Sequence, residues 1–446
     1  MKSTTSESDL AMSPVMEASR MSPVALTAAW WSNASPMFWP FIAAALAQAY
    51  GTRNALIGMG AAVVFYGLAG GILARYAIRT GLGCFLFSHV LFGSIGAPVA
   101  TLIFFATAIY YAMFEGAVLA VTASKIIPGV SYAWASVVIV LYSVPLIAGS
   151  VQRWLNKFNG VLFPVYIGGL ALAVSLCLMK YGYSTAWLRL GPATGNSEWG
   201  WWNCFVAYLG ASIFFMFSQD FARFGRLRDS RYHGLVNFGY VFYAITFMLN
   251  GVVGIFLVGM TQLSHLTEAS VVDAFVAVLG GSMALGFVWV TQTRINTANY
   301  YVSTVNMQAF FESLFPLRLR KFTWAVIVGV IVLALMLVGN ALKYMLVALS
   351  YQGVFVTAWA GVALSHVLLV PASTVAGVGS GQQGAAWPKV NVAGLSGWLS
   401  GAAFGLVLMK QEGLLHTLST PGTLIVSAIM YALLRRREPT LERQIA

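Results

Sequence analysis

The chain has 446 residues, of which 59% are hydrophobic and only 9% are charged, and its mean hydropathy is +0.79. A soluble protein carries roughly 25% charged residues, so a chain this poor in charge cannot cover a water-facing surface. The composition therefore excludes a soluble globular protein and a disordered chain, and the three cysteines are too few for a disulfide scaffold. Long continuous apolar runs, such as 161–179 and 324–339, favour membrane-spanning helices over the alternating pattern of a β-barrel.

Many segments of the chain are apolar and long enough to cross a membrane, which takes about 20 helical residues. We expect an all-α polytopic membrane protein with a polar tail at 1–22, a ten-helix core at 23–364, a linker at 365–389, two additional transmembrane helices at 390–434 and a basic tail at 435–446. Residues 83–96 and 300–315 are predicted to be shorter interfacial or re-entrant helices. The predicted spans are 24–49, 54–74, 97–123, 132–151, 159–180, 201–221, 234–259, 271–298, 323–340, 342–364, 390–409 and 419–434.

The placement of basic residues supports this topology. With both termini in the cytoplasm, eighteen of the 25 lysines and arginines lie on the cytoplasmic side and six outside, while Arg294 falls within a span. Cytoplasmic loops of membrane proteins carry such an excess. The net charge of +12 is thereby explained without a nucleic-acid partner. We expect a multi-pass protein of the cell (inner) membrane that is surrounded by lipid and needs no obligate protein partner.

Two of the predicted helices look interrupted. The first contains WWSNASPMFWPF at residues 30–41, where Pro36 and Pro40 remove backbone donors and Ser32, Asn33 and Ser35 can satisfy the freed groups. The sixth carries Gly210, Ala211 and Ser212 near mid-membrane. Because the two spans are five apart, they occupy equivalent places in two five-helix halves, which is typical of a transporter's central site. The alternative is a proline kink in one helix and small-residue packing in the other.

Two ionisable residues lie where the membrane makes them unfavourable. Glu115 is central in the third span, where a charge costs about +2.5 to +3.5 kcal/mol. It is expected either to take part in a binding site or to be a protonated side chain bonded between helices. Arg294, near the inner end of the eighth span, either snorkels to the cytoplasmic interface or points inward and neutralises a carboxylate such as Glu115.

The side chains around these positions suit a flat polar heterocycle. Aromatic rings such as Tyr111, Trp39 and Phe214 can stack on its face, and carboxylate or amide groups can bond its edge. Such edge bonds reject analogues, because a mismatched ligand leaves buried polar groups unpaired. The sequence therefore predicts a small heterocyclic substrate near helices one, three, six and eight.

Several stretches resemble the purine–cytosine permease family, the nucleobase–cation symporters, over residues 24–435. The most specific is DFARFGR at Asp220 to Arg226, which matches the family signature D-F-x-R-F-G-R. The others are TGL at 80–82 with Gly93 and Gly96, TRINTANYY at 293–301, VALSYQGVF at 347–355 and KVNVAGLSGW at 389–398.

The resemblance implies about twelve helices, the first ten forming a LeuT-type five-plus-five inverted repeat, and uptake of a nucleobase or related ring. The stacking aromatic of helix 3 is matched by Tyr111, and the Gln four residues later by Glu115. The aromatic of helix 6 falls near Ala211 or Ser212, so that stack is lost or moves to Phe214. The amide of helix 8 that reads the ring is matched by Asn296 or Asn299. A carboxylate in place of an amide favours a donor-rich or cationic ring.

The resemblance also implies a co-transported H+ or Na+ and no organic cofactor. Sodium in this fold is held by carbonyls of broken helix 1, here near 35–39, and by hydroxyls of helix 8, here Thr291 and Thr293. Arg294 beside them can stand in for the ion, so we expect H+ coupling through Glu115 in preference to Na+. In DFARFGR, Asp220, Arg223 and Arg226 are expected to form a cytoplasmic gate or loop anchor, or simply positive-inside charge.

Two other classes of function compete with transport. A membrane-embedded enzyme would need clustered His, Asp or Cys, whereas the five histidines are scattered along the chain. A transceptor, which binds the ligand as a sensor with little flux, has the same binding residues as a transporter. Counterflow of labelled ligand separates these two.

Overall fold

The computed structural model describes residues 12–148, 151–192, 195, 198–261, 270–338, 341–373 and 388–436. In these residues the regular structure is helical, with one isolated bridge between Met21 and Gly225 as the only strand-like pairing. Six of the described helices are long and apolar enough to cross a membrane, and the bent pair α8 (Gly200–Leu209) and α9 (Ile213–Ala222) makes a seventh candidate. The predicted all-α class is confirmed.

The helices follow the order of the predicted spans. Between them lie α10 (Ser230–Tyr232), α13 (Ser270–Leu279), α19 (Gly413–Thr417), short 3-10 turns and two π-helical segments, His233–Asn237 and Ala244–Leu249. The helices matching the spans are α2 (Pro23–Trp30) with α3 (Phe38–Tyr50), α4 (Thr52–Thr80), α5 (Cys84–Ile126), α6 (Tyr132–Ala148), α7 (Val151–Tyr181), α8 with α9, α11 (Tyr240–Tyr243) with α12 (Asn250–Thr261), α14 (Gly281–Leu314), α15 (Lys321–Leu337), α16 (Ala341–Leu369), α18 (Val392–Met409) and α20 (Ser419–Arg435).

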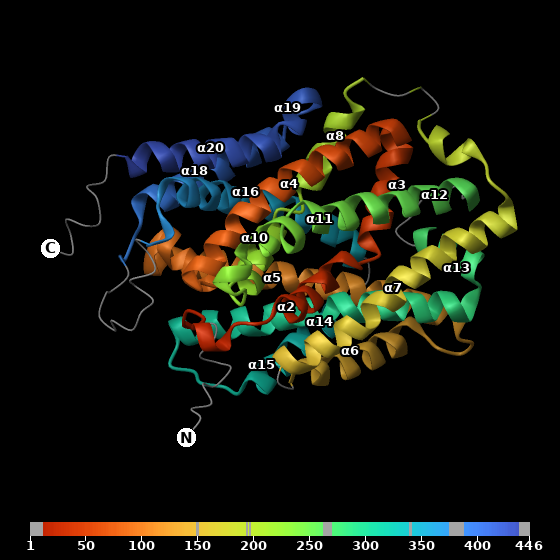
Figure 1. Ribbon diagram of the computed structural model, residues 1–446, viewed down its shortest axis with the longest axis horizontal. Coiled ribbons are helices and arrows are strands. Elements are labelled where there is room, and N and C mark those ends of the chain that lie inside the picture. Colours follow the sequence, from red (N-terminus) through yellow and green to blue (C-terminus); the bar gives the residue numbers. More distant parts are fainter. Residues whose placement is uncertain are drawn as a thin grey trace.

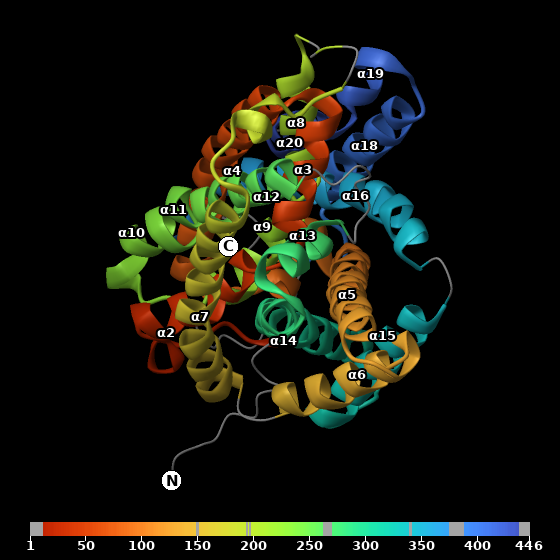
Figure 2. The same ribbon diagram turned by 90° about the vertical axis from the view of Figure 1, so that its right-hand side faces the viewer.

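The long helices run along the long axis of the molecule (Figure 1). Viewed end-on, α5 and α14 pack together near the centre, beside α3 and α9 (Figure 2). The pair α6 and α15 covers one flank, and α16, α18 and α20 form the other. The C-terminal end of α20 and the residues preceding α2 lie at the same end of the molecule (Figure 1), as expected for a chain whose ends share one side of the membrane.

The eighth span differs from the prediction. Gly280, with φ +78°, separates α13 from α14, so the predicted span 271–298 crosses a helix break. In addition, α14 continues to Leu314, so a separate interfacial helix at 300–315 was a wrong prediction. The reason is that its polar side chains face the protein interior: Ser303 and Asn306 are at most 1% exposed.

The segment 83–96 is also not an interfacial helix. It begins as a buried first arm of α5, which breaks at Gly93, where φ is +77°. The Ser94 amide beyond the break donates to the Pro388 carbonyl at 3.0 Å, just ahead of α18. A second chain segment thus satisfies the backbone at the kink, as irregular backbone inside a membrane requires.

The predicted polar tail lies against the helices over its described part, residues 12–22, here called the N-terminal strap. The Val15 amide donates to the Gly81 carbonyl at 2.9 Å, and the Met21 amide to the Phe224 carbonyl at 2.8 Å. Val15 is buried. The strap therefore joins the end of α4 to the loop that follows α9.

The predicted boundaries near the C-terminus shift slightly. The last helix of the core, α16, ends at Leu369, beyond the expected limit at 364. Residues 374–387 of the predicted linker and 437–446 of the predicted basic tail lie outside the described residues.

Candidate functional site

Helix 1 is broken where its prolines predict. A 3-10 turn over Trp31–Ala34 and an irregular stretch through Pro36 separate α2 from α3. The Asn33 amide donates to the Trp30 carbonyl at 2.8 Å, and the Ser35 hydroxyl donates to the Ser32 carbonyl at 2.8 Å. These polar side chains satisfy backbone groups freed by the break.

Helix 6 is broken as well. The axes of α8 and α9 differ by 44° across Gly210–Ser212. The Ser212 hydroxyl donates to the Leu209 carbonyl at 2.7 Å, and the Tyr66 hydroxyl reaches the Tyr208 carbonyl at 2.9 Å from α4. Both predicted interruptions are therefore present, and both are held by side-chain hydrogen bonds.

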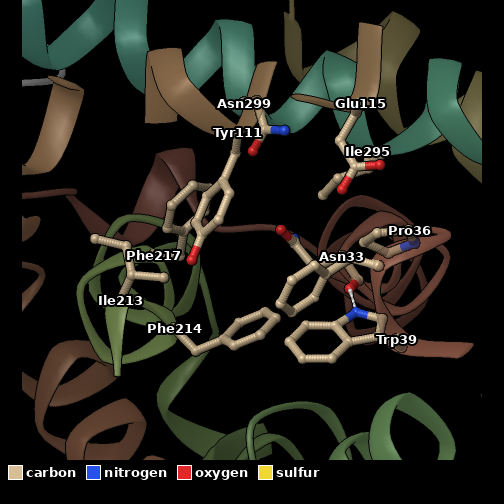
Figure 3. A pocket seen from close by; sticks show the side chains of 11 residues that line it. Asn33, Pro36, Trp39, Tyr111, Glu115, Ile213, Phe214, Phe217, Ile295 and Asn299 are labelled. Carbon is tan, nitrogen blue, oxygen red and sulfur yellow. Dashed lines mark hydrogen bonds between the residues drawn. The ribbon is translucent and has the colours of Figure 1, made fainter. Parts of the chain in front are cut away.

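A small cavity lies between the two breaks and the helices α5 and α14 (Figure 3). Its volume is about 40 Å³, which is room for a few water molecules, each needing about 10–15 Å³. Five of the predicted site residues border it: Trp39, Tyr111, Glu115, Phe214 and Asn299. The other lining residues are Asn33, Pro36, Phe38, Ile213, Phe217 and Ile295.

Three predicted substrate residues do not line this cavity. Gly210 borders a neighbouring, larger vestibule, and the Ser212 hydroxyl is used within its own helix. Asn296 accepts a long hydrogen bond from Asn299 at 3.5 Å, so of the two candidate amides Asn299 is the one that borders the cavity.

The vestibule adjoins the cavity through shared walls. It has a volume of about 660 Å³ and borders Phe38, Trp39 and Tyr111, which also line the cavity. Tyr50, at the end of α3, and Ser419, at the start of α20, place it on the side opposite the described chain ends. The side chains of Phe38, Trp39 and Tyr111 therefore lie between the cavity and this side.

Aromatic rings close the cavity on the other side. This layer begins at Phe214, on which Trp39 of the vestibule wall stacks with ring centroids 5.4 Å apart and planes at 28°. Below them, the fully buried Trp30 contacts Phe214, Phe238 and Phe242, at 6.0, 4.8 and 4.9 Å between centroids. The route toward the described chain ends is therefore closed by a packed aromatic cluster.

Glu115 is 3% exposed and is hydrogen-bonded to the side-chain amide of Gln292, a residue that the sequence analysis did not single out. Gln292 of α14 donates from Nε2 to the Glu115 carboxylate and to the Glu115 carbonyl at 3.3 Å. Gln292 lies in the most polar stretch of the predicted spans, and that polarity was the available signal. Glu115 thus borders the cavity and is also hydrogen-bonded between α5 and α14, a position that is compatible with either expected role.

Arg294 points inward, as one of the two expected alternatives has it, but not toward Glu115. Its side chain is fully buried, so it does not reach the interface, and its guanidinium lies over the Phe163 and Tyr166 rings at 5.1 and 5.6 Å. The Nη2 group donates to the Trp31 carbonyl at 3.1 Å. No ion pair with Glu115 occurs in the described structure.

The groups expected to hold a sodium ion have other partners. The Thr291 hydroxyl donates to the Val288 carbonyl at 2.9 Å, and Thr293 pairs with the Tyr142 hydroxyl at 2.7 Å. The helix-1 carbonyls that accept hydrogen bonds from side chains of α14 and α12 are those of Trp31 and Ala34, whereas the sodium prediction named residues 35–39. The Ala34 carbonyl accepts from the Asn250 amide at 2.7 Å.

Asp220 ties three helices together away from the cavity. Its carboxylate accepts from the Cys84 amide at 2.8 Å, at the start of α5, and from the Asn306 side chain of α14 at 2.7 Å. Arg223 is 1% exposed and donates from Nε to the Asp220 carbonyl at 3.2 Å, whereas Arg226 is partly exposed. Of the roles considered for the motif, this geometry fits a loop anchor best.

No family model and no curated protein matches the chain. Solved structures do. Mhp1, a nucleobase-cation-symport-1 family transporter in a closed conformation with bromovinylhydantoin bound, aligns with a TM-score of 0.75 and 15% identity over 96% of this chain and 95% of that one. The chain has the fold of a LeuT-type transporter. Inward-facing Mhp1 aligns at 0.74 with 14% identity over 95% and 92%, and an outward-open Na+-coupled sialic acid symporter at 0.69 with 12% over 98% and 94%. The predicted inverted-repeat architecture is thereby confirmed.

Proposed function

We propose that this protein is a secondary active transporter that imports a nucleobase or related nitrogen heterocycle by alternating access. The observation that carries the proposal is the central cavity, where a carboxylate, two amides and several aromatic rings meet between two broken helices. The fold shared with Mhp1 and the DFARFGR motif support membership of the nucleobase–cation symporter group. The location proposed is the cell (inner) membrane, with both termini in the cytoplasm.

The cavity chemistry suits a ring with several N–H donors. Glu115 accepts hydrogen bonds at one edge, and Asn33 and Asn299 offer amides at others (Figure 3). Tyr111 presents an aromatic face, and stacking on such a face contributes about 1–3 kcal/mol per base. Cytosine, purines, hydantoins, allantoin and pyrimidine precursors are the candidate classes, and the carboxylate favours donor-rich or cationic members.

A cavity of about 40 Å³ is too small for a heterocyclic ring. A ring enters only if Phe38 and Trp39 move into the vestibule, which has about 660 Å³ of space beside them. Side-chain movement at this wall is therefore the first step of binding in the proposed cycle.

Protons are the proposed coupling ion. Arg294 donates to the Trp31 carbonyl at the break of helix 1, and Asn250 occupies the Ala34 carbonyl. The guanidinium at the Trp31 carbonyl supplies the positive charge that a bound cation would supply, so sodium binding is disfavoured there. Glu115 is the carboxyl group of the cavity and is proposed to carry the proton with the substrate.

Uptake by purified protein in liposomes tests the proposal. Labelled cytosine, hypoxanthine and bromovinylhydantoin are supplied singly, under an imposed pH gradient or a sodium gradient. We expect one of these rings to accumulate with the pH gradient, and Glu115→Gln to abolish accumulation while retaining counterflow exchange. Sodium-driven uptake would refute the proton assignment. Binding without counterflow would identify a transceptor instead.

A further inference from the structure

Gln292 occupies a point where three parts of the site meet. Its side chain is fully buried on α14. The Nε2 group donates to the Glu115 carboxylate and carbonyl, while Oε1 accepts from the Met37 amide at 3.2 Å. The Thr291 hydroxyl, which donates to the Val288 carbonyl, lies 3.3 Å from Oε1. A carboxamide has two N–H donors and an oxygen with two lone pairs. Both N–H groups and one lone pair of this amide are therefore in use.

The orientation of the amide is fixed by the main chain. If the Gln292 group turned over, its NH2 would face the Met37 N–H, and two donors would meet. Because Met37 can only donate there, Oε1 must face the break of helix 1. The NH2 group must then face Glu115.

This orientation has a consequence for the carboxyl group. Hydrogen bonds to an ionised carboxylate are stronger than those to a neutral acid. Gln292 therefore favours the charged form of Glu115 and occupies its Oε2 atom. A proton taken up by Glu115 therefore binds to Oε1, the other carboxylate oxygen.

We propose that Gln292 is a positioning residue for proton coupling, which orients the Glu115 carboxyl group and links its charge to the start of α3 through Met37. The inference rests on the proposed function of Glu115. Met37 directly precedes α3, whose residues Phe38 and Trp39 separate the cavity from the vestibule. Weakening the hydrogen bond between Gln292 and Glu115 therefore affects Phe38 and Trp39, the side chains that must move for binding.

Few other ionisable groups bear on Glu115. Tyr111 lies one turn away on the same helix, and the Arg294 guanidinium on α14 is directed to the Trp31 carbonyl. On the neighbouring helices, the Tyr142 hydroxyl of α6 pairs with Thr293, and the carboxylate of Asp220 on α9 binds the Cys84 amide. In the described cavity lining, Tyr111 and Glu115 are the titratable side chains.

The test follows the protonation of Glu115 directly, without a ligand. Infrared difference spectra of the purified protein are recorded across pH, and the carboxyl band of Glu115 is the one that Glu115→Gln removes. We expect Gln292→Leu to move the midpoint of this band to higher pH by about one unit, because the charged form loses its donor. Gln219→Leu is the matched control, since Gln219 is also fully buried but donates to the Leu73 carbonyl.

The link to helix 1 has its own measurement. In the native protein, amide exchange of residues 31–40 should change across the pH range in which the Glu115 band titrates, and in Gln292→Leu this dependence should disappear. If Gln292→Leu does not fold, Gln292→Asn serves instead, because the shorter amide cannot reach both partners. An unmoved midpoint in the folded variant would overturn the inference. If Glu115→Gln leaves proton-driven uptake intact, it is the proposed function that fails.

Discussion

Trp30 is predicted to hold the inner side of the pathway closed. The ring is fully buried among Phe214, Phe221, Phe238 and Phe242, with centroid distances of 4.8 to 6.0 Å. Replacing a buried Trp by Ala costs about 3–5 kcal/mol. If about 3 kcal/mol of this is lost only from the inward-closed state, the inward-open state gains roughly 100-fold in relative population.

Cysteine labelling can detect this shift. A Phe217→Cys reporter lines the cavity, and the native cysteines are removed so that it is the sole target. In inside-out vesicles, an impermeant maleimide should label the reporter quickly in Trp30→Ala and slowly with Trp30 present. Phe38→Ala, which opens the opposite wall, is the control and should speed labelling from the outside only. Equal labelling from the cytoplasmic side with and without Trp30 would refute the reasoning.

Other substitutions test the ring contact and the two backbone anchors. Tyr111→Ala should weaken ligand binding by roughly 5- to 150-fold in a thermal-shift titration, since stacking contributes about 1–3 kcal/mol, whereas Tyr111→Phe should keep most of the affinity. Gly93→Ala should lower the unfolding temperature, because φ is +77° and a Cβ would lie 2.6 Å from the Pro388 carbonyl oxygen. Asp220→Ala should do the same by leaving the Cys84 amide unpaired, at about 1–3 kcal/mol, and Asp220→Asn should be milder. If Gly93→Ala or Asp220→Ala left the unfolding temperature unchanged, the anchoring role of that residue would be contradicted.

The helix breaks were predictable because their causes are local. Pro36 and the small residues at 210–212 alter the backbone wherever they occur in a helix, so their effect can be read from the chain itself. Tyr111 and Glu115 were likewise predicted to share a face, because residues four apart do so in any α-helix. Both reach the same cavity in the structure.

The contacts of helix 8 could not be predicted in the same way. Which side chain of α14 meets Glu115 depends on how α14 is rotated against α5, and that rotation is set by packing along the whole helix. Gln292 rather than Arg294 reaches the carboxylate, although the two are only two residues apart. The start of α14 was missed because hydropathy is equally high on both sides of Gly280, where the chain turns.

The two barriers along the proposed transport pathway differ in what they are made of. Toward the vestibule, the wall is formed by side chains such as Phe38 and Trp39. Toward the opposite end there is an aromatic layer and, beyond it, the N-terminal strap, whose main chain is paired with Gly81 and Phe224. Opening the vestibule wall requires only the rotation of side chains, whereas displacing the N-terminal strap breaks several hydrogen bonds at once. The rate of substrate release should therefore depend more steeply on temperature than the rate of substrate entry. At low temperature, release should become the slower half of the proposed cycle.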